Sequence, residues 1–149
     1  MESKDLKKTF GIIAKNNEFT STLGIWYKES QDCIFTISLQ KSNYETLFYV
    51  NLKIFIKDIF GIEYKIDKSI KNDTGDIFLR TPKEYNNYFN FEIEIPHDER
   101  TDGLRRLFAE FINPFSEKAL KKEKIFDLEK EGKILILPAV KEELEKMIV

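Results

Sequence analysis

Hydrophobic and polar residues alternate along two neighbouring stretches in the first half of the chain. In residues 33–39 every second side chain is apolar, and the same period of two continues through residues 48–56. This is the period of a β-strand, whose successive side chains point to opposite faces of a sheet. Ser42 and Asn43, between the two stretches, are residues that turns favour. The pattern predicts a β-hairpin with one apolar face and one polar face.

Shorter apolar patterns predict further strands elsewhere in the sequence. They are residues 23–28, 77–80, 88–96 and 133–137. Residues 57–71 contain both apolar and charged side chains without a clear period, and their pattern fits either a short helix or another strand.

Helical spacing predominates at the two ends of the chain. Apolar side chains recur at steps of three and four, which is the period of an amphipathic helix. The spacing predicts helices over residues 3–13, from 101 to the residue before Pro114, from about Pro114 to Gly132, and from Pro138 onward.

Strands therefore gather in the first two thirds of the chain and helices in the last third. This order is typical of the α+β class. We expect an antiparallel β-sheet of four to six strands, with an N-terminal helix and two to three C-terminal helices packed on one face. The length of 149 residues suits a single domain over residues 1–149.

Charge and cysteine content narrow the functional classes. The 24 basic side chains are balanced by 26 acidic ones, for a net charge of −2, whereas a dedicated nucleic-acid binder usually shows a basic excess.

The single cysteine, Cys33, cannot form an internal disulfide, so we expect a reducing compartment. Because Cys33 lies on the apolar side of its strand pattern, we also expect its thiol to be buried and inert. The charged first ten residues are unlike a signal peptide, and the longest apolar run, residues 134–140, is too short to span a bilayer. We expect a cytoplasmic protein with no membrane or nucleic-acid partner.

A resemblance to a known family rests on two segments, FTSTLGIWYK at residues 19–28 and FTISLQKSNYETLFYVNL at residues 35–52. Both are similar to the bacterial domain of unknown function 4304, in which an LQKS turn precedes an aromatic–Val–Asn–Leu strand. IFLR at residues 77–80 is similar to a later strand of that family, which ends in arginine. The chain differs from the family at Lys53, where glycine is expected. The resemblance covers residues 1–125 and implies the fold and the hairpin, but no activity.

The polar face of the hairpin is the candidate site. Ser38 is expected opposite Asn51, and Gln40 opposite Tyr49. Amide side chains carry both donors and acceptors, and an arginine offers a planar fork for an anion. The candidate binding residues are Gln40, Lys41, Ser42, Asn51 and Arg80. The alternative for this face is a solvated surface with turn-forming residues, and for Arg80 it is an ion pair with a nearby acid.

Signatures of catalysis are sparse. The chain has one histidine and lacks Walker, GxSxG, HExxH and GxGxxG motifs, so we expect no catalytic residues, no metal and no cofactor. Our leading hypothesis is a small bacterial binding protein that uses the polar sheet face, such as an immunity or regulatory partner of another protein. The alternative hypothesis is an enzyme or a binder of a small anionic ligand held by the same side chains.

Overall fold

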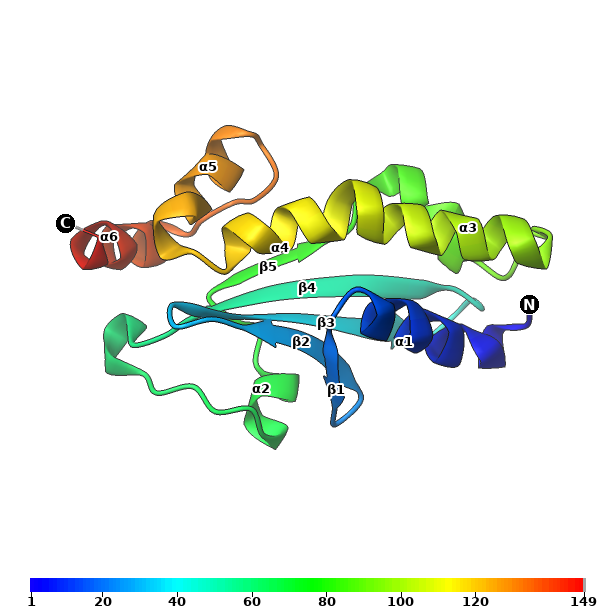
Figure 1. The fold of residues 1–149 in the computed structure, drawn as a ribbon, viewed down its shortest axis with the longest axis horizontal. Coiled ribbons are helices and arrows are strands. Elements are labelled where there is room, and N and C mark those ends of the chain that lie inside the picture. Colours follow the sequence, from blue (N-terminus) through cyan, green and yellow to red (C-terminus); the bar gives the residue numbers. More distant parts are fainter. Residues whose placement is uncertain (149) are drawn as a thin grey trace.

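The computed structural model of the protein describes residues 1–148, and its centre is a five-stranded antiparallel sheet (Figure 1). The strands follow one another in space in the order of the sequence. They are β1 (Thr20–Thr22), β2 (Ile25–Glu29), β3 (Cys33–Lys41), β4 (Phe48–Ile56) and β5 (Ile77–Arg80). The predicted α+β class with an antiparallel sheet is confirmed.

The predicted hairpin is the β3–β4 pair, in which nine residue pairs face one another from Cys33↔Ile56 to Lys41↔Phe48. The strand predicted at residues 23–28 is confirmed as β2, except that its first two residues form the turn of a second hairpin, β1–β2. Leu23 and Gly24 both have left-handed backbone conformations, with φ of 50° and 80°. Two such residues make the tight turn whose twist matches that of paired strands, so the chain reverses between β1 and β2.

Helices cover the apolar face of the sheet, as predicted (Figure 1). They are α1 (Leu6–Asn16), α3 (His97–Leu107), α4 (Asn113–Ala119), α5 (Ile125–Lys130) and α6 (Pro138–Met147). Between them and the sheet lies one large core that is rich in phenylalanine, in which Phe10 of α1 contacts Trp26 of β2 and Phe108. Within residues 1–148, no helix combines the length and the apolar character needed to cross a bilayer.

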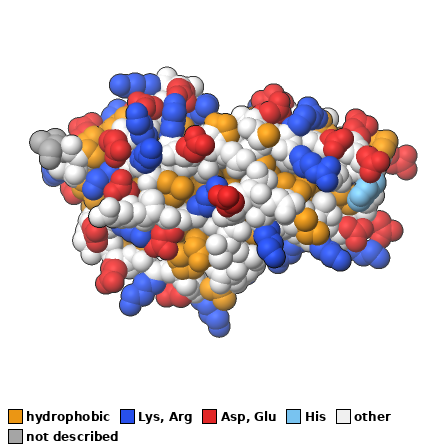
Figure 2. All heavy atoms as spheres, in the orientation of Figure 1, with side chains coloured by type: hydrophobic (Ala, Val, Ile, Leu, Met, Phe, Trp, Pro, Cys, Tyr) orange, Lys and Arg blue, Asp and Glu red, His pale blue; other side chains and the backbone are white. Residues whose placement is uncertain are grey.

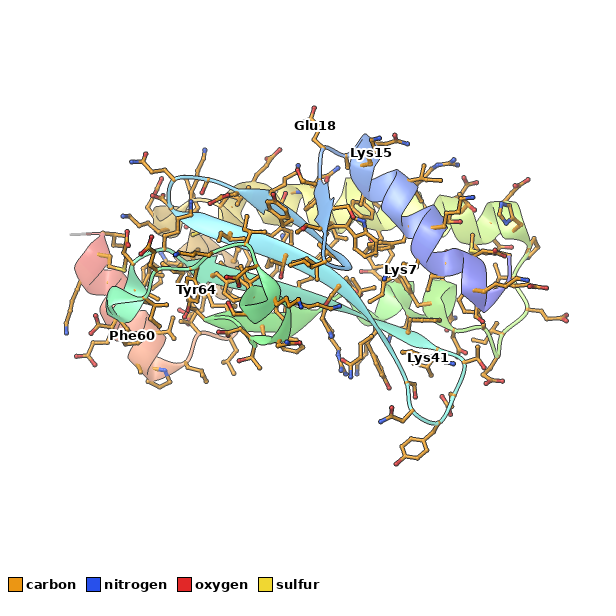
Figure 3. All side chains as sticks on the ribbon, turned by 90° about the horizontal axis from the view of Figure 1, so that it is seen from below. Lys7, Lys15, Glu18, Lys41, Phe60 and Tyr64 are labelled. Atoms are coloured by element: carbon orange, nitrogen blue, oxygen red, sulfur yellow. The ribbon has the colours of Figure 1, made fainter. Side chains whose placement is uncertain are left out.

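The opposite face is covered over only part of its area. Residues 57–71, whose secondary structure the pattern left open, contain a short 3₁₀ turn and most of the helix α2 (Lys68–Asn72). Ile70 of α2 packs with Ile25, Ile34 and Phe55 in a second, smaller cluster beneath the sheet. In Figure 3, which views this face, the segment that carries Tyr64 lies over one part of the sheet and leaves the rest uncovered. Gln40 of β3 and Arg80 of β5 are exposed on this face, whereas Asn51 of β4, between them, is buried and only 8% exposed.

The predicted helix end before Pro114 is wrong, because α3 and α4 form one continuous helix. They are joined by a π-helical turn over Phe108–Ile112. Proline lacks an N–H and its ring clashes with the carbonyl four residues earlier in an α-helix. The π-turn, with its wider hydrogen-bond spacing, accommodates Pro114 without a break.

Two predicted strands are also wrong. Residues 88–96 follow a 3₁₀ helix (Lys83–Phe89) and form only a single bridge, Leu47↔Asn90. Residues 133–137 pair with no strand among residues 1–148, although Ile134 and Ile136 are buried in the core. Alternation of apolar side chains is present in both segments, but a strand also needs a partner for its backbone groups.

Candidate binding surface on the open face of the sheet

The strand register brings three of the predicted residues together. Asn51 of β4 faces Ser38 of β3 on one side and Arg80 of β5 on the other, and Gln40 faces Tyr49. The predicted pairing within the hairpin is confirmed. Side chains at these even positions of β3 and odd positions of β4 point away from the helices.

Gln40, Asn51 and Arg80 form a hydrogen-bonded triad across three strands. The Asn51 amide Nδ2 donates to Gln40 Oε1 over 2.8 Å. Arg80 Nε donates to Asn51 Oδ1 over 3.1 Å, and Arg80 Nη2 reaches Gln40 Oε1 at 3.4 Å. Each amide thus orients the next side chain, and together they fix one edge of the guanidinium group.

The guanidinium of Arg80 also lies over an aromatic ring. Its Cζ is 4.0 Å from the centroid of the Tyr49 ring, within the range of a cation–π contact. No carboxylate of residues 1–148 lies within 4.0 Å of Arg80, so the predicted alternative of an ion pair is wrong. Arg80 Nη1 has no hydrogen-bond acceptor within the described chain, and the side chain is exposed. The surface therefore presents a guanidinium group that is fixed in position and whose Nη1 donors can bind an acceptor on another molecule.

The surface around the triad is partly apolar. Phe78 is 45% exposed and Tyr49 36% exposed, and both flank Arg80. Five hollows of about 190 to 850 Å³ on residues 1–148 have no lining from Gln40, Asn51 or Arg80, although Tyr49 lines the one of about 190 Å³. We call Gln40, Tyr49, Asn51, Phe78 and Arg80 the Arg80 surface.

Lys41 and Ser42 do not join the Arg80 surface. Lys41 follows Gln40 in the strand, so the alternation turns its side chain to the opposite face. Ser42 shapes the loop: its backbone N–H donates to Leu47 O, and its hydroxyl accepts from the backbone N–H of Tyr44. The turn-forming alternative accounts for Ser42.

A buried arginine that the sequence analysis did not single out holds the segment before α3. Arg100 is only 2% exposed, and its guanidinium donates to the backbone carbonyls of Tyr88 and Ile93 at 2.8 and 2.9 Å, with Asn90 O at 3.3 Å. It also lies over the Phe91 ring at 4.1 Å. Arg100 is four residues before Leu104, on the apolar face of the helix, and that spacing was the available signal. Its contacts are structural, since they satisfy backbone oxygens.

Glu92, an acidic side chain in the segment before α3, has a structural role as well. Glu92 Oε1 accepts a hydrogen bond from the backbone N–H of Thr46 over 3.0 Å and ties the hairpin loop to the segment before α3. Within residues 1–148, no three His, Cys, Asp or Glu side chains are grouped so that they could hold a metal ion.

Cys33 is fully buried, and burial is the main cause that raises the pKa of its thiol from 9.0 to about 12, with smaller effects from Asp32 and Asp76. An unfolded chain releases this proton near pH 9. The stabilisation that the raised pKa represents is therefore complete below pH 9 and is lost as the pH rises toward 12.

We therefore expect the free energy of unfolding to fall above pH 9, with Cys33 contributing about 1.4 kcal/mol per pH unit. Urea denaturation at a series of pH values between 8 and 11 measures this slope. Cys33→Ala should show a shallower slope than the wild-type chain, whatever its stability at pH 8. Equal slopes would contradict the assignment.

Comparison with protein families gives one match. A family model described as Domain of unknown function (DUF4304) matches residues 13–134. No curated protein and no solved structure matches the chain.

Proposed function

The chain belongs to the DUF4304 family, and we propose that it is a small cytoplasmic binding protein that recognises another protein through the Arg80 surface. In a bacterial cell this role would be that of an immunity or regulatory partner. The observation that supports the proposal most directly is the guanidinium of Arg80, which two amides and an aromatic ring hold in place and which has no carboxylate partner among residues 1–148.

The composition of the Arg80 surface fits a protein partner. Tyrosine and arginine are enriched among the residues that contribute most to protein–protein affinity, and such residues lie near the centre of an interface. Here Arg80 is flanked by two partly exposed aromatic side chains, Tyr49 and Phe78. Gln40, Asn51 and Arg80 line none of the five hollows described above, which favours a protein partner over a small ligand, because small ligands usually bind in a concave pocket. The partner is expected to place a carboxylate over Arg80 Nη1.

The second candidate is a small anion bound at Arg80, and the free Nη1 donors favour it. The position of Lys41 on the other face weakens this candidate, because one of the two cations proposed for the site is absent from it.

The test compares capture of partners from a lysate of the source organism by three immobilised chains. Wild-type protein should retain a specific partner, Arg80→Glu should retain at least about tenfold less, and Lys41→Glu, which changes the same charge on the opposite face, should match wild type. Circular dichroism and thermal melting confirm that each variant is folded.

Equal capture by wild type and Arg80→Glu would refute the proposal, and so would repeated failure to recover any partner. A thermal shift of wild type but not of Arg80→Glu, in phosphate or in a short dicarboxylate, would favour the small-anion candidate instead.

A further inference from the structure

A groove lies on another part of the molecule, between α1 and the β1–β2 hairpin. It has a volume of about 850 Å³, and its apolar lining includes Ile12 of α1, Phe19 and Trp26 of β2. Ile12 is 54% exposed, which is unusual for an isoleucine beside a well-packed core. Figure 3 shows β1 beside α1, and it labels Lys7 and Lys15, which lie near the two ends of α1. The size and the mostly apolar lining match those of ligand pockets.

The indole N–H of Trp26, which lines this groove, has no hydrogen-bond partner within residues 1–148. The residue as a whole is only 4% exposed. Gly11 lies beside it, since a Cβ added to Gly11 would be 3.3 Å from Trp26 Nε1. Both residues line the groove. Although most of the Trp26 ring is buried, its N–H is not among the fully buried unpaired groups of residues 1–148, so this donor is accessible to a molecule bound in the groove.

The rim of the groove is basic. Its charged lining residues are Lys4, Lys7, Lys8 and Lys15, and none is acidic. Within residues 1–148, only Lys4 of these has a carboxylate within 4.0 Å, from Glu2 in an exposed pair. In a chain with a net charge of −2, this is a local excess of positive charge.

Beside the tip of the β1–β2 hairpin, Lys7 of the groove lies near a further cation, Lys71, which does not itself line the groove. The Nζ atoms of Lys71 and Lys7 lie 3.2 and 3.5 Å from the position that a Cβ on Gly24 would take. They come from α2 and α1, which meet the tip of the β1–β2 hairpin from different sides (Figure 3). Neither ammonium has a carboxylate within 4.0 Å among the described residues. Two unpaired cations this close favour an anionic group between them.

We propose that the groove binds a small amphiphilic anion, an apolar chain that ends in a carboxylate or a phosphate. The anionic head lies at Lys7 and Lys71, the apolar chain lies along Ile12 and Phe19, and an oxygen of the ligand accepts the indole N–H of Trp26. Lys7 to Lys15 span about 12 Å along the axis of α1, room for an extended chain. The site is separate from the Arg80 surface and does not depend on its function.

The single tryptophan of the sequence gives a direct test. In ¹⁵N-labelled protein the only indole N–H signal belongs to Trp26, and it should shift downfield in a saturable way on titration with dodecanoate or dodecyl phosphate below the concentrations at which they form micelles. Comparing the two ligands distinguishes a carboxylate head from a phosphate head. Dodecanol, which has the same chain without the charge, should bind at least about tenfold more weakly.

Variants separate the two halves of the site. Lys7→Glu combined with Lys71→Glu should weaken binding of the anions at least about tenfold and leave the weak binding of dodecanol unchanged. Ile12→Ser should weaken binding of all three molecules. Lys121→Glu changes an exposed lysine that does not line the groove; it is the matched control and should bind as wild type does.

Three outcomes would overturn the proposal. They are no shift of the indole signal with either anion in protein that is folded by circular dichroism, equal affinity for dodecanol and dodecanoate, and a shift produced by an acidic peptide but by neither amphiphile.

Discussion

Replacing Arg100 with alanine is expected to lower the free energy of unfolding by about 3–5 kcal/mol. The guanidinium is the donor for the backbone carbonyls of Tyr88, Asn90 and Ile93, and it is buried. Each buried acceptor left without a donor costs roughly 1–3 kcal/mol, and water entering the space would recover part of this. Urea denaturation followed by circular dichroism measures the change.

Two further substitutions make the Arg100 experiment specific. Arg100→Lys keeps the charge but loses the planar fork, so we expect an intermediate loss of stability. Arg105→Ala removes an exposed arginine of the same helix, paired only with Asp102, and should change stability by less than about 1 kcal/mol. Similar losses for Arg100→Ala and Arg105→Ala would show that the carbonyl contacts do not stabilise the fold.

Replacing Gly103 with alanine is expected to destabilise the protein by about 1–3 kcal/mol. In an exposed helix the same change usually gains up to about 1 kcal/mol, so the expected sign is reversed. A Cβ on Gly103 would lie 2.4 Å from Cδ1 of the Tyr88 ring, closer than any real contact. Tyr88 cannot move freely, because its hydroxyl accepts from Arg106 and its backbone carbonyl accepts from Arg100.

A double-mutant cycle with Tyr88→Ala tests the cause of the Gly103 effect. In the Tyr88→Ala background the ring is gone, and Gly103→Ala should become neutral or stabilising. The same loss in both backgrounds would place the cost in the helix backbone and contradict the steric explanation. Thermal or urea denaturation of the four proteins completes the cycle.

The contrast between the β3–β4 hairpin and residues 88–96 shows what a sequence pattern can predict. Both have alternating apolar side chains, and only the hairpin forms a ladder, because each of its strands has a neighbour next in the chain. In residues 88–96 the backbone carbonyls of Asn90 and Ile93 bind Arg100 instead of another strand. The Asn90 carbonyl accepts from a side chain ten residues later in the sequence. Such a contact does not change the alternation of apolar and polar residues, so the pattern cannot reveal it.

The candidate site was predictable in part for the same reason. The pairing of Gln40 with Tyr49 follows from the hairpin, and the register of a neighbouring strand was needed to place Arg80 beside Asn51. Lys41 was assigned to the site because it is polar and near the turn, although its position one residue after Gln40 already implied the other face. The α1 groove was not predicted, since its parts come from segments whose contact depends on tertiary packing.

Acidic and basic side chains are interspersed over the face shown in Figure 2, which is typical of a surface that keeps a protein soluble without attracting one class of partner. Against this background the two features that favour an anionic group are the guanidinium of Arg80, held over Tyr49, and the groove beside α1, whose charged lining residues are all lysines.

The order of the strands also bears on how the protein is made. All five strands precede residue 81, while the helices from α3 onward begin at His97. A chain emerging from the ribosome therefore finishes its sheet first, through connections between successive neighbours. Until the last third has been synthesised, the phenylalanine-rich side of that sheet has only α1 to shield it, and this is the interval in which a chaperone has most to protect.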